Sequence, residues 1–211
     1  MDGPNNGFSV MQMSDLFSKC AQNDVEEVDM DCYLDAWDEL IRFLNLMGSA
    51  FTFVSSDVTK KVAILRKFRA DCPEEYKSVV KMLAHEKTNG VIKTVQINGS
   101  RTLLRLHRAL KFLQILFAKL AKNEDKGKVS DMAYNAYHSS PMAKYHPWLV
   151  RKAVGVAVYV LPNREGFIET LNQNVPTAEL ESTMESCSSN MEIIYKHTDA
   201  LYKENDMLEL P

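Results

Sequence analysis

The sequence predicts an all-α protein in which about eight helices form a single domain. Apolar residues recur at helical spacing along most of the chain, and no stretch of convincing length alternates between apolar and polar residues as a half-buried strand does. The chain has only 8 glycines, and its prolines fall between the periodic segments rather than inside them. With 211 residues it is long enough for one sizeable domain. We expect this domain to span residues 8–211, behind a flexible tail at residues 1–7.

The first half of the chain supplies four of the expected helices. They are Phe8–Ala21, Asp29–Met47, Ala50–Arg69 and a segment that runs from Pro73 to about Gly90. In the second of these, Leu34, Trp37 and Leu40 repeat at helical spacing and define an apolar face. Gly48 separates the second segment from the third, because glycine weakens a helix more than any residue except proline.

The second half of the chain supplies the remaining helices. They are Ser100–Lys122, a short helix near residues 129–139, Pro147 to about Leu161, and segments near 164–172 and 177–203. Pro147 stands where the first turn of a helix accepts proline, because that turn leaves the backbone N–H without an intrahelical partner in any case. Pro162 then ends this helix, because the residue before a proline is pushed out of the helical region.

Composition excludes several classes of function. The net charge of −3 gives no general affinity for nucleic acid, so any cationic behaviour is local. The longest apolar run, Ala153–Leu161, is too short to span a bilayer, and the N-terminal region lacks the apolar core of a secretory signal. The cysteines, Cys20, Cys32, Cys72 and Cys187, form no CxxC pair and are interpreted as free thiols of a reducing compartment. We expect a cytoplasmic protein without a metal or cofactor.

One expected helix carries a second face that changes character along its length. At about 100° per residue, Arg101, Arg105 and Arg108 fall on one stripe of Ser100–Lys122. The same stripe continues one to two turns later as Phe112, Ile115 and Leu116. The opposite face supplies the ordinary core contact, and only a narrow arc around His107 is left for water. The arginines have two possible interpretations. They lie on a solvent-exposed edge of the helix, as runs of charged residues more often do, or they line the opening of a pocket that binds an amphiphile with an anionic head group.

A second helix embeds a pair of charges among apolar residues. Asp57 and Lys61 are four residues apart and therefore lie on one face of the segment Ala50–Arg69. The apolar residues around them on that face are Phe53, Val54, Ile64 and Phe68. An ordinary i,i+4 ion pair explains the spacing but not the apolar surroundings. The two helices with charges among apolar residues therefore suggest one shared site.

The stretch from Tyr145 to Trp148 adds two further candidates. His146 precedes a proline, whose rigid φ fixes the direction of the chain at a helix entrance. It is interpreted as a capping or core histidine, which is the commoner case, or as a hydrogen-bond donor in the site. Trp148 suits either the core or a membrane interface, where Arg151 and Lys152 would attract an anionic leaflet. These three residues are the candidates for membrane contact.

Three stretches resemble the signature regions of the glycolipid transfer protein superfamily. They are FVSSDVTKKVAILRKF, RTLLRLHRALKFLQ and the region from AKYHPWLVRKAV to LPNREGF. The resemblance runs in order, with compatible spacing, from about residue 8 to the C-terminal stretch LYKENDMLELP. It implies a two-layer, all-helical sandwich that opens between its layers to receive lipid chains.

The resemblance also implies a role for each charged candidate. Asp57 matches the aspartate that accepts a hydrogen bond from a sphingolipid amide N–H, and His146 matches the histidine that donates one to the amide carbonyl. Lys61, Arg101 and Arg105 match the cations that hold a phosphate. Beside them, Arg108 matches a further basic residue of the family.

Departures from the sugar-binding members favour a phosphate as the head group. Those members have asparagine and tryptophan at the positions of Lys61 and Arg105, and a lysine at the position of Ile64. A sugar needs a flat apolar face and neutral hydrogen bonds. A phosphomonoester carries about −1.5 to −2 charges near neutrality and needs cations.

Together these features imply transfer of ceramide-1-phosphate between membranes, without catalysis. The apolar pocket for the lipid chains is expected at Phe53, Val54, Ile64, Phe112, Ile115 and Leu116. We expect a monomer that contacts Golgi, plasma and other intracellular membranes transiently. The alternatives are a sphingolipid sensor or adaptor and a carrier of another sphingolipid. An enzyme is disfavoured because GxSxG, HExxH and P-loop motifs are missing from the sequence.

Overall fold

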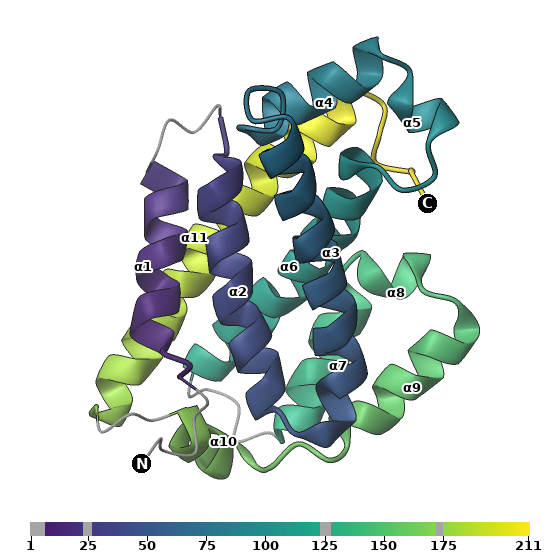
Figure 1. The fold of residues 1–211 in the computed structure, drawn as a ribbon. Helices are drawn as coiled ribbons and strands as arrows, with labels where there is room; N and C mark the ends of the chain where they lie inside the picture. Colours follow the sequence, from purple (N-terminus) through teal and green to yellow (C-terminus); the bar gives the residue numbers. More distant parts are fainter. Residues whose placement is uncertain (1–6, 23–26, 123–127, 172–174) are drawn as a thin grey trace.

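The computed structural model describes residues 7–22, 27–122, 128–171 and 175–211, and in these ranges it is built from helices and turns (Figure 1). The α-helices are α1 (Val10–Gln22), α2 (Met30–Leu46), α3 (Thr52–Asp71), α4 (Val79–Thr88), α5 (Val91–Thr94), α6 (Gly99–Ala121), α7 (Val129–Ser139), α8 (Met142–Tyr145), α9 (Trp148–Val158), α10 (Arg164–Leu171) and α11 (Thr177–Glu204). A turn of 3₁₀-helix at Ser49–Phe51 precedes α3. The predicted all-α class is confirmed. Of the tail expected at residues 1–7, only Gly7 lies within the described residues.

The structure describes eleven α-helices where about eight were expected, and two of the eleven were not among the expected segments. Helices α5 and α8 have 4 residues each, too few to display an apolar period. Helix α4 also begins later than Pro73, because the residues before Ser78 form turns. The side chain of Ser78 then caps α4 by accepting a hydrogen bond from the backbone N–H of Lys81.

The helices form two layers. Helices α1, α2 and α3 lie side by side in one layer, and α6, α7 and α11 lie behind them (Figure 1). Across the layers, α1 packs against α11 and α3 packs against α6. The buried ring of Phe43 in α2 joins the layers, since its centroid lies 4.9 Å from that of Phe117 in α6 and 6.2 Å from that of Phe167 in α10. The two-layer sandwich is therefore as expected.

Helix α11 covers the arc of α6 that was expected to face water. His107 is only 1% exposed, and its ring stacks on Tyr195 with centroids 4.2 Å apart. Its Nε2 lies 3.2 Å from Oδ1 of Asp199, and Lys111 on the same arc pairs with Glu192. The prediction of a solvated arc is wrong, because periodicity tells which residues share a face but not which helix covers that face.

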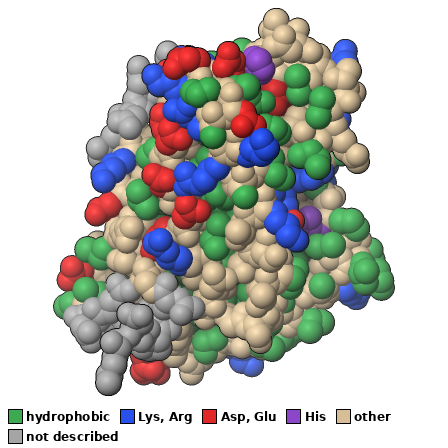
Figure 2. All heavy atoms as spheres, in the orientation of Figure 1, with side chains coloured by type: hydrophobic (Ala, Val, Ile, Leu, Met, Phe, Trp, Pro, Cys, Tyr) green, Lys and Arg blue, Asp and Glu red, His purple; other side chains and the backbone are tan. Residues whose placement is uncertain are grey.

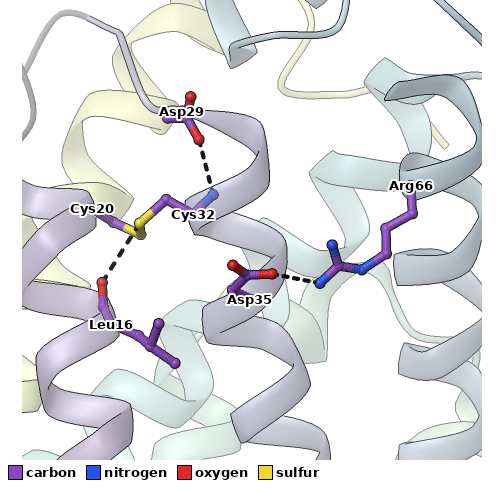
Figure 3. The surroundings of a disulfide bond; sticks show 6 residues. All are labelled: Leu16, Cys20, Asp29, Cys32, Asp35 and Arg66. Carbon is purple, nitrogen blue, oxygen red and sulfur yellow. Dashed lines mark hydrogen bonds and ion pairs between the residues drawn. A yellow bond between two sulfur atoms is a disulfide. The ribbon is translucent and has the colours of Figure 1, made fainter. Parts of the chain in front are cut away.

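Two of the four cysteines form a disulfide, in contrast to the expectation that all are free thiols. Cys20 near the end of α1 and Cys32 near the start of α2 are bonded, with Cα atoms 5.8 Å apart (Figure 3). Asp29 fixes the start of α2 beside this bond by accepting a hydrogen bond from the backbone N–H of Cys32, at 2.9 Å. Cys72 and Cys187 are free. Motif spacing missed this pair because packing between helices, rather than a short CxxC motif, brings the sulfurs together.

Among the described residues, no helix is both long enough and apolar enough to cross a bilayer.

Candidate functional site

Charged residues from α3, α6 and the α8–α9 region gather at one cleft. The cleft has a volume of about 620 Å³, and Asp57, Lys61, Arg105, Arg108 and His146 all line it. Figure 2 shows basic, acidic and histidine side chains close together between α3 and the lobe formed by α8 and α9. Residues far apart in the sequence therefore converge on one opening.

Arg101 lies beside this group rather than on the wall of the cleft. Its Nη2 donates to the carbonyl oxygen of Ile92 in α5, at 3.1 Å. Its Nε is buried and has no hydrogen-bond partner among the described residues. A buried donor without a partner is costly, so this guanidinium keeps one hydrogen bond that the described residues leave unmade.

A buried carboxylate holds the start of α6 and with it the arginine stripe. Glu86 of α4 is fully buried and accepts hydrogen bonds from the backbone N–H groups of Gly99 and Ser100, at 2.6 and 2.8 Å, and from the hydroxyl of Tyr76, at 2.7 Å. A carboxylate is favourable here because a helix N-terminus presents unpaired N–H groups and positive potential. A Cβ on Gly99 would lie 2.6 Å from Sδ of Met82, so only glycine fits without a shift.

Asp57 and Lys61 form an ion pair in which the two groups differ in exposure. Lys61 Nζ lies 2.5 Å from Asp57 Oδ2, and the lysine side chain is 15% exposed while the aspartate side chain is 66% exposed. The lysine stem is therefore packed along apolar surface with its charge at the cleft. The carboxylate remains open to a donor from a ligand.

Arg105 and Arg108 share a stripe but differ in their partners. Arg105 is exposed, and its Nη2 donates to the carbonyl oxygen of Pro211 at 3.2 Å. Arg108 is 6% exposed, lies over the ring of Tyr145 at 3.4 Å, and donates to the carbonyl oxygens of Leu208 and Leu210. Burial lowers the pKa of Arg108, which stays far above neutrality. Arg105 is thus the more available cation, and Arg108 mainly anchors the C-terminal segment.

His146 is oriented by a tyrosine from α7. Its Nδ1 lies 2.9 Å from the hydroxyl of Tyr137, and a hydroxyl that donates to Nδ1 leaves the ring hydrogen on Nε2. Burial lowers the pKa of His146, Asp57 raises it, and Lys61 and Arg108 lower it further. The ring is therefore neutral at pH 7 and able to donate one hydrogen bond into the cleft.

An apolar hollow continues inward from the cleft. It shares Phe53, Val54, Val58, Ala109, Met142 and Val154 with the cleft, and it reaches Trp37, Leu44, Phe51, Phe112, Leu113, Tyr137, Ala157 and Val158. None of the described residues that line it carries a charge. Its volume of about 50 Å³ is smaller than the roughly 150 Å³ of an engineered cavity that binds one benzene molecule, so a lipid chain enters only if the walls move apart. A cleft lined by charged residues that continues into an apolar hollow is the geometry expected of a site that binds an amphiphile.

Comparison with known proteins assigns the chain to a family. The family model described as glycolipid transfer protein (GLTP) matches residues 28–173. The chain belongs to the glycolipid transfer protein family. The ceramide-1-phosphate transfer protein of Homo sapiens is 36% identical over 217 residues, which cover 100% of both chains. That of Danio rerio is 36% identical over 97% of this chain and 98% of its own.

Solved structures of family members superpose closely on this chain. The apo form of mouse ceramide-1-phosphate transfer protein has a TM-score of 0.90 at 35% identity and covers 97% of this chain and 100% of its own. The human protein in complex with 2:0 ceramide-1-phosphate has a TM-score of 0.89 at the same identity and coverage. The glycolipid transfer protein fold expected from the sequence is thereby confirmed.

Within this glycolipid transfer protein fold, the expected apolar residues divide into two groups. Phe53, Val54 and Phe112 line the hollow. Leu116 is fully buried in the core, Ile115 packs against the core, and Ile64 is half-buried; none of these three lines the cleft or the hollow. On α6 the hollow is lined by Ala109, Phe112 and Leu113, which lie on one face of the helix, and it does not reach Ile115 or Leu116 in the next turn.

Sequence reasoning also missed lining residues that this family member uses. Tyr145 and Pro211 line the cleft, and Val58 and Met142 line both the cleft and the hollow. Ala109 had a detectable signal, since a small residue one turn after Arg105 leaves space beside the charged stripe. The sequence contains no comparable signal for Pro211, because this residue reaches α6 only when the chain turns back after α11.

The three residues expected at a membrane lie together on α9. Trp148 is 63% exposed, Arg151 and Lys152 are exposed, and Lys152 Nζ lies 5.8 Å from the centroid of the Trp148 ring. They are on the outer surface, so the interpretation of Trp148 as a core residue is excluded.

Proposed function

We propose that this protein binds ceramide-1-phosphate and carries it between membranes. The observation that supports this most directly is that four polar side chains line one cleft above the apolar hollow: Lys61, Arg105, Asp57 and His146. Full-length relatives from human and zebrafish are named ceramide-1-phosphate transfer protein, and the human protein has been solved with 2:0 and 12:0 ceramide-1-phosphate. The lipid is carried chemically unchanged.

The cations at the mouth hold the phosphate in this proposal. Lys61 provides a point charge from α3, and Arg105 provides a guanidinium fork from α6. Arg101 lies beside the cleft with its Nε buried and unpartnered, so it joins this group when its side chain turns toward the anion. Arg108 also makes the electrostatic potential at the cleft more positive, although it donates its hydrogen bonds to the carbonyl oxygens of Leu208 and Leu210.

Asp57 and His146 recognise the amide of the sphingoid backbone by hydrogen bonds. The exposed carboxylate accepts the amide N–H, and Nε2 of the neutral imidazole donates to the amide carbonyl. The ester-linked backbone of a glycerolipid has no amide N–H for the carboxylate, and a hydrogen-bonding group left without its partner costs about 1–3 kcal/mol. This pair therefore selects sphingolipids, while the cations select among their head groups.

The chains enter the apolar hollow between the layers. Burying a methylene group is worth about 0.8 kcal/mol whether the group leaves water for the bilayer or for the protein. The chain contribution therefore nearly cancels between donor membrane and protein, and transfer needs no energy source. Phe53 is 48% exposed and lines both the cleft and the hollow, so it is the side chain best placed to move aside.

The membrane encounter is peripheral and transient in this proposal. Trp148, Arg151 and Lys152 touch the bilayer, and a monomer presents the cleft from the cytoplasm to Golgi, plasma and other intracellular membranes. Residues 8–211 act as one lipid-binding domain.

Vesicle-to-vesicle transfer of ceramide-1-phosphate, ceramide, glucosylceramide and phosphatidic acid tests the proposal. Ceramide-1-phosphate should move fastest. Lys61→Ala should slow its transfer by about tenfold, because a hydrogen bond to a charged group contributes about 1.5–3 kcal/mol. Lys60→Ala is the matched control, since Lys60 is the adjacent residue of α3, is exposed and does not line the cleft. A folded Lys61→Ala protein that transfers as fast as Lys60→Ala would disprove the head-group assignment.

A further inference from the structure

One hydrogen bond joins the apolar hollow to the charged cleft. Tyr137 of α7 lines the hollow and not the cleft, whereas His146 lines the cleft and not the hollow. The hydroxyl of Tyr137 nevertheless lies 2.9 Å from Nδ1 of His146. A side chain from the region expected to receive the lipid chains therefore touches a side chain from the region expected to bind the head group.

Packing fixes the position of this hydroxyl. Tyr137 is 2% exposed, and its ring meets that of Phe112 in α6 edge-on, with centroids 6.4 Å apart and 79° between the ring planes. The hydroxyl lies on the long axis of the ring, so a ring flip does not move it. Burial raises the pKa of Tyr137, so the hydroxyl keeps its hydrogen at neutral pH. Tyr137 therefore offers His146 a neutral O–H group at a fixed place.

The surroundings of Tyr137 decide which atom donates in this hydrogen bond. The hydroxyl either donates to an Nδ1 without a hydrogen or accepts from an Nδ1 that carries one. In the second case the hydrogen of the hydroxyl needs another acceptor, and within the described part of the chain this hydroxyl forms no other hydrogen bond. A buried donor left without a partner is costly. The hydroxyl therefore donates, and the hydrogen of the neutral imidazole lies on Nε2.

The position of this hydrogen sets the polarity of the amide site. Nε2–H of His146 donates into the cleft, while the carboxylate of Asp57, whose side chain is 66% exposed, accepts. An amide is complementary to this pair because it has one N–H donor and one carbonyl acceptor. In the other tautomer Nε2 would present a lone pair, and the carbonyl oxygen of the amide would face an acceptor instead of a donor.

We propose that Tyr137 is the positioning residue that makes this site selective for an amide, by holding the hydrogen of His146 on Nε2. Tyr137 touches His146 rather than the head group, so it acts through the imidazole. Its ring is at the same time part of the wall of the hollow, so a lipid chain there contacts the residue that orients the head-group donor. This inference rests on the proposed function, because it assigns Tyr137 a role in the same lipid site.

Long-range ¹H–¹⁵N correlation spectra measure the tautomer directly and need no lipid. At about pH 8 the ring of His146 is neutral, since burial lowers its pKa. Its signals are identified by their loss in His146→Ala. The wild type should carry the hydrogen on Nε2, and in Tyr137→Phe the ratio of the Nε2–H form to the Nδ1–H form should fall by about fivefold. An unchanged ratio, or a wild-type hydrogen on Nδ1, would overturn the proposal.

Tyr134→Phe is the matched control for these spectra. Tyr134 lies on α7 one turn before Tyr137, is 45% exposed and lines neither the cleft nor the hollow. Removal of its hydroxyl should leave the tautomer of His146 as it is in the wild type. An equal change of the ratio in both variants would mean that loss of either hydroxyl from α7 disturbs the imidazole, and it would overturn the specific role of Tyr137.

A double-mutant cycle separates positioning from a structural role in the wall of the hollow. Tyr137→Phe should slow vesicle-to-vesicle transfer of ceramide-1-phosphate by about fivefold when His146 is present. In the His146→Ala background it should slow transfer by less than about twofold, because no imidazole remains to be oriented. An equal loss in both backgrounds would assign the hydroxyl to the wall or to the stability of the fold and would overturn the proposal.

The two measurements also distinguish this inference from the proposed function. Absence of ceramide-1-phosphate transfer by the wild type with every vesicle composition overturns the proposed function, while the spectra still decide whether Tyr137 sets the tautomer. Transfer by the wild type, combined with an unchanged tautomer ratio in Tyr137→Phe, overturns the role of Tyr137 alone.

Discussion

At the scale of single residues, burial rather than position on a helical stripe decides what a charged side chain does. Arg105 and Arg108 are neighbours on one face of α6, yet Arg105 is exposed at the cleft and Arg108 is 6% exposed beneath the C-terminal segment. The ring of Tyr145 and two backbone carbonyls satisfy the buried guanidinium. A buried charge is tolerated only with such partners, and these partners leave less of it for a ligand.

His107 should make the stability of the protein depend on pH. Burial lowers its pKa below the ordinary 6.5, while Asp199 raises it and the nearby Arg108 and Lys111 lower it. On acidification the unfolded chain therefore takes up a proton at this ring before the folded chain does. The free energy of unfolding should fall by about 1 kcal/mol per pH unit for this proton below about pH 6.5, until the folded-state pKa is reached.

Urea unfolding at several pH values measures this effect. His107→Gln should show a smaller slope of unfolding free energy against pH between about pH 6 and pH 5. Part of the slope should remain, because burial also lowers the pKa of His146. Equal slopes in the variant and the wild type would rule out His107 as a source of the pH dependence.

At the scale of elements, the start of α6 shows how one helix is positioned for a site. Glu86 from α4 accepts the first N–H groups of α6, and Asn98 caps the same end by accepting from the backbone N–H of Arg101. The three arginines follow within the next turns. Any movement of this helix end would therefore displace the cationic stripe relative to Asp57 and Lys61 on α3.

Two glycine substitutions test the tight packing of this helix end. Gly99→Ala should lower the free energy of unfolding by about 1–3 kcal/mol, because the new Cβ would lie 2.6 Å from Sδ of Met82 and 2.8 Å from a ring carbon of Tyr76. Gly155→Ala in α9 is the matched control, since its Cβ would meet nothing within 4 Å. That change should be neutral or stabilising by up to about 1 kcal/mol. Denaturant midpoints that move in the same direction for both variants would contradict this account.

At the scale of the whole molecule, the disulfide does not link two walls of the hollow. The disulfide between Cys20 and Cys32 joins α1 to α2 within one layer. The hollow has walls from α2, α3, α6, α7, α8, α9 and the 3₁₀ turn, and none of the described residues that line it belongs to α1. The disulfide therefore stabilises the fold without preventing the walls of the apolar hollow from moving apart.

Reduction should consequently affect stability much more than transfer. Loss of a disulfide that closes a loop of this length should lower the free energy of unfolding by about 3 kcal/mol. Unfolding curves with and without dithiothreitol should differ for wild type and for the Cys72→Ser control, but coincide for Cys20→Ser. At a temperature where all forms are folded, transfer of ceramide-1-phosphate should be the same in the oxidised and reduced proteins. A large loss of transfer on reduction would place the disulfide in the lipid pathway.

Much of the fold could be predicted from the sequence, and the reasons for the exceptions are physical. Long amphipathic helices such as α2 and α6 were predicted to within one residue at each end, because caps and apolar periods are local signals. The single turns α5 and α8 carry no such signal. The disulfide and the burial of His107 depend on which helices become neighbours, and periodicity alone does not contain that information.

The candidate site was predicted to a similar degree. The faces of α3 and α6 that carry Asp57, Lys61 and Arg105 could be read from spacing, and these residues do line one cleft. Arg101 shares the stripe but is held by the carbonyl of Ile92 beside the cleft. The ligand roles of these residues stay predictions until lipid transfer by the variants is measured.

The helical class, the family and the sets of side chains that share a helix face can all be derived from the amino-acid sequence, since they follow from local geometry and from motifs along the chain. Which of these faces meet depends on the packing of the helices. This packing brought His146 from the α8–α9 corner to Asp57 and Lys61, and it directed the hollow along Ala109 and Leu113. The physical reason is that periodicity depends on residues a few positions apart, whereas packing and burial depend on contacts between residues far apart in the chain.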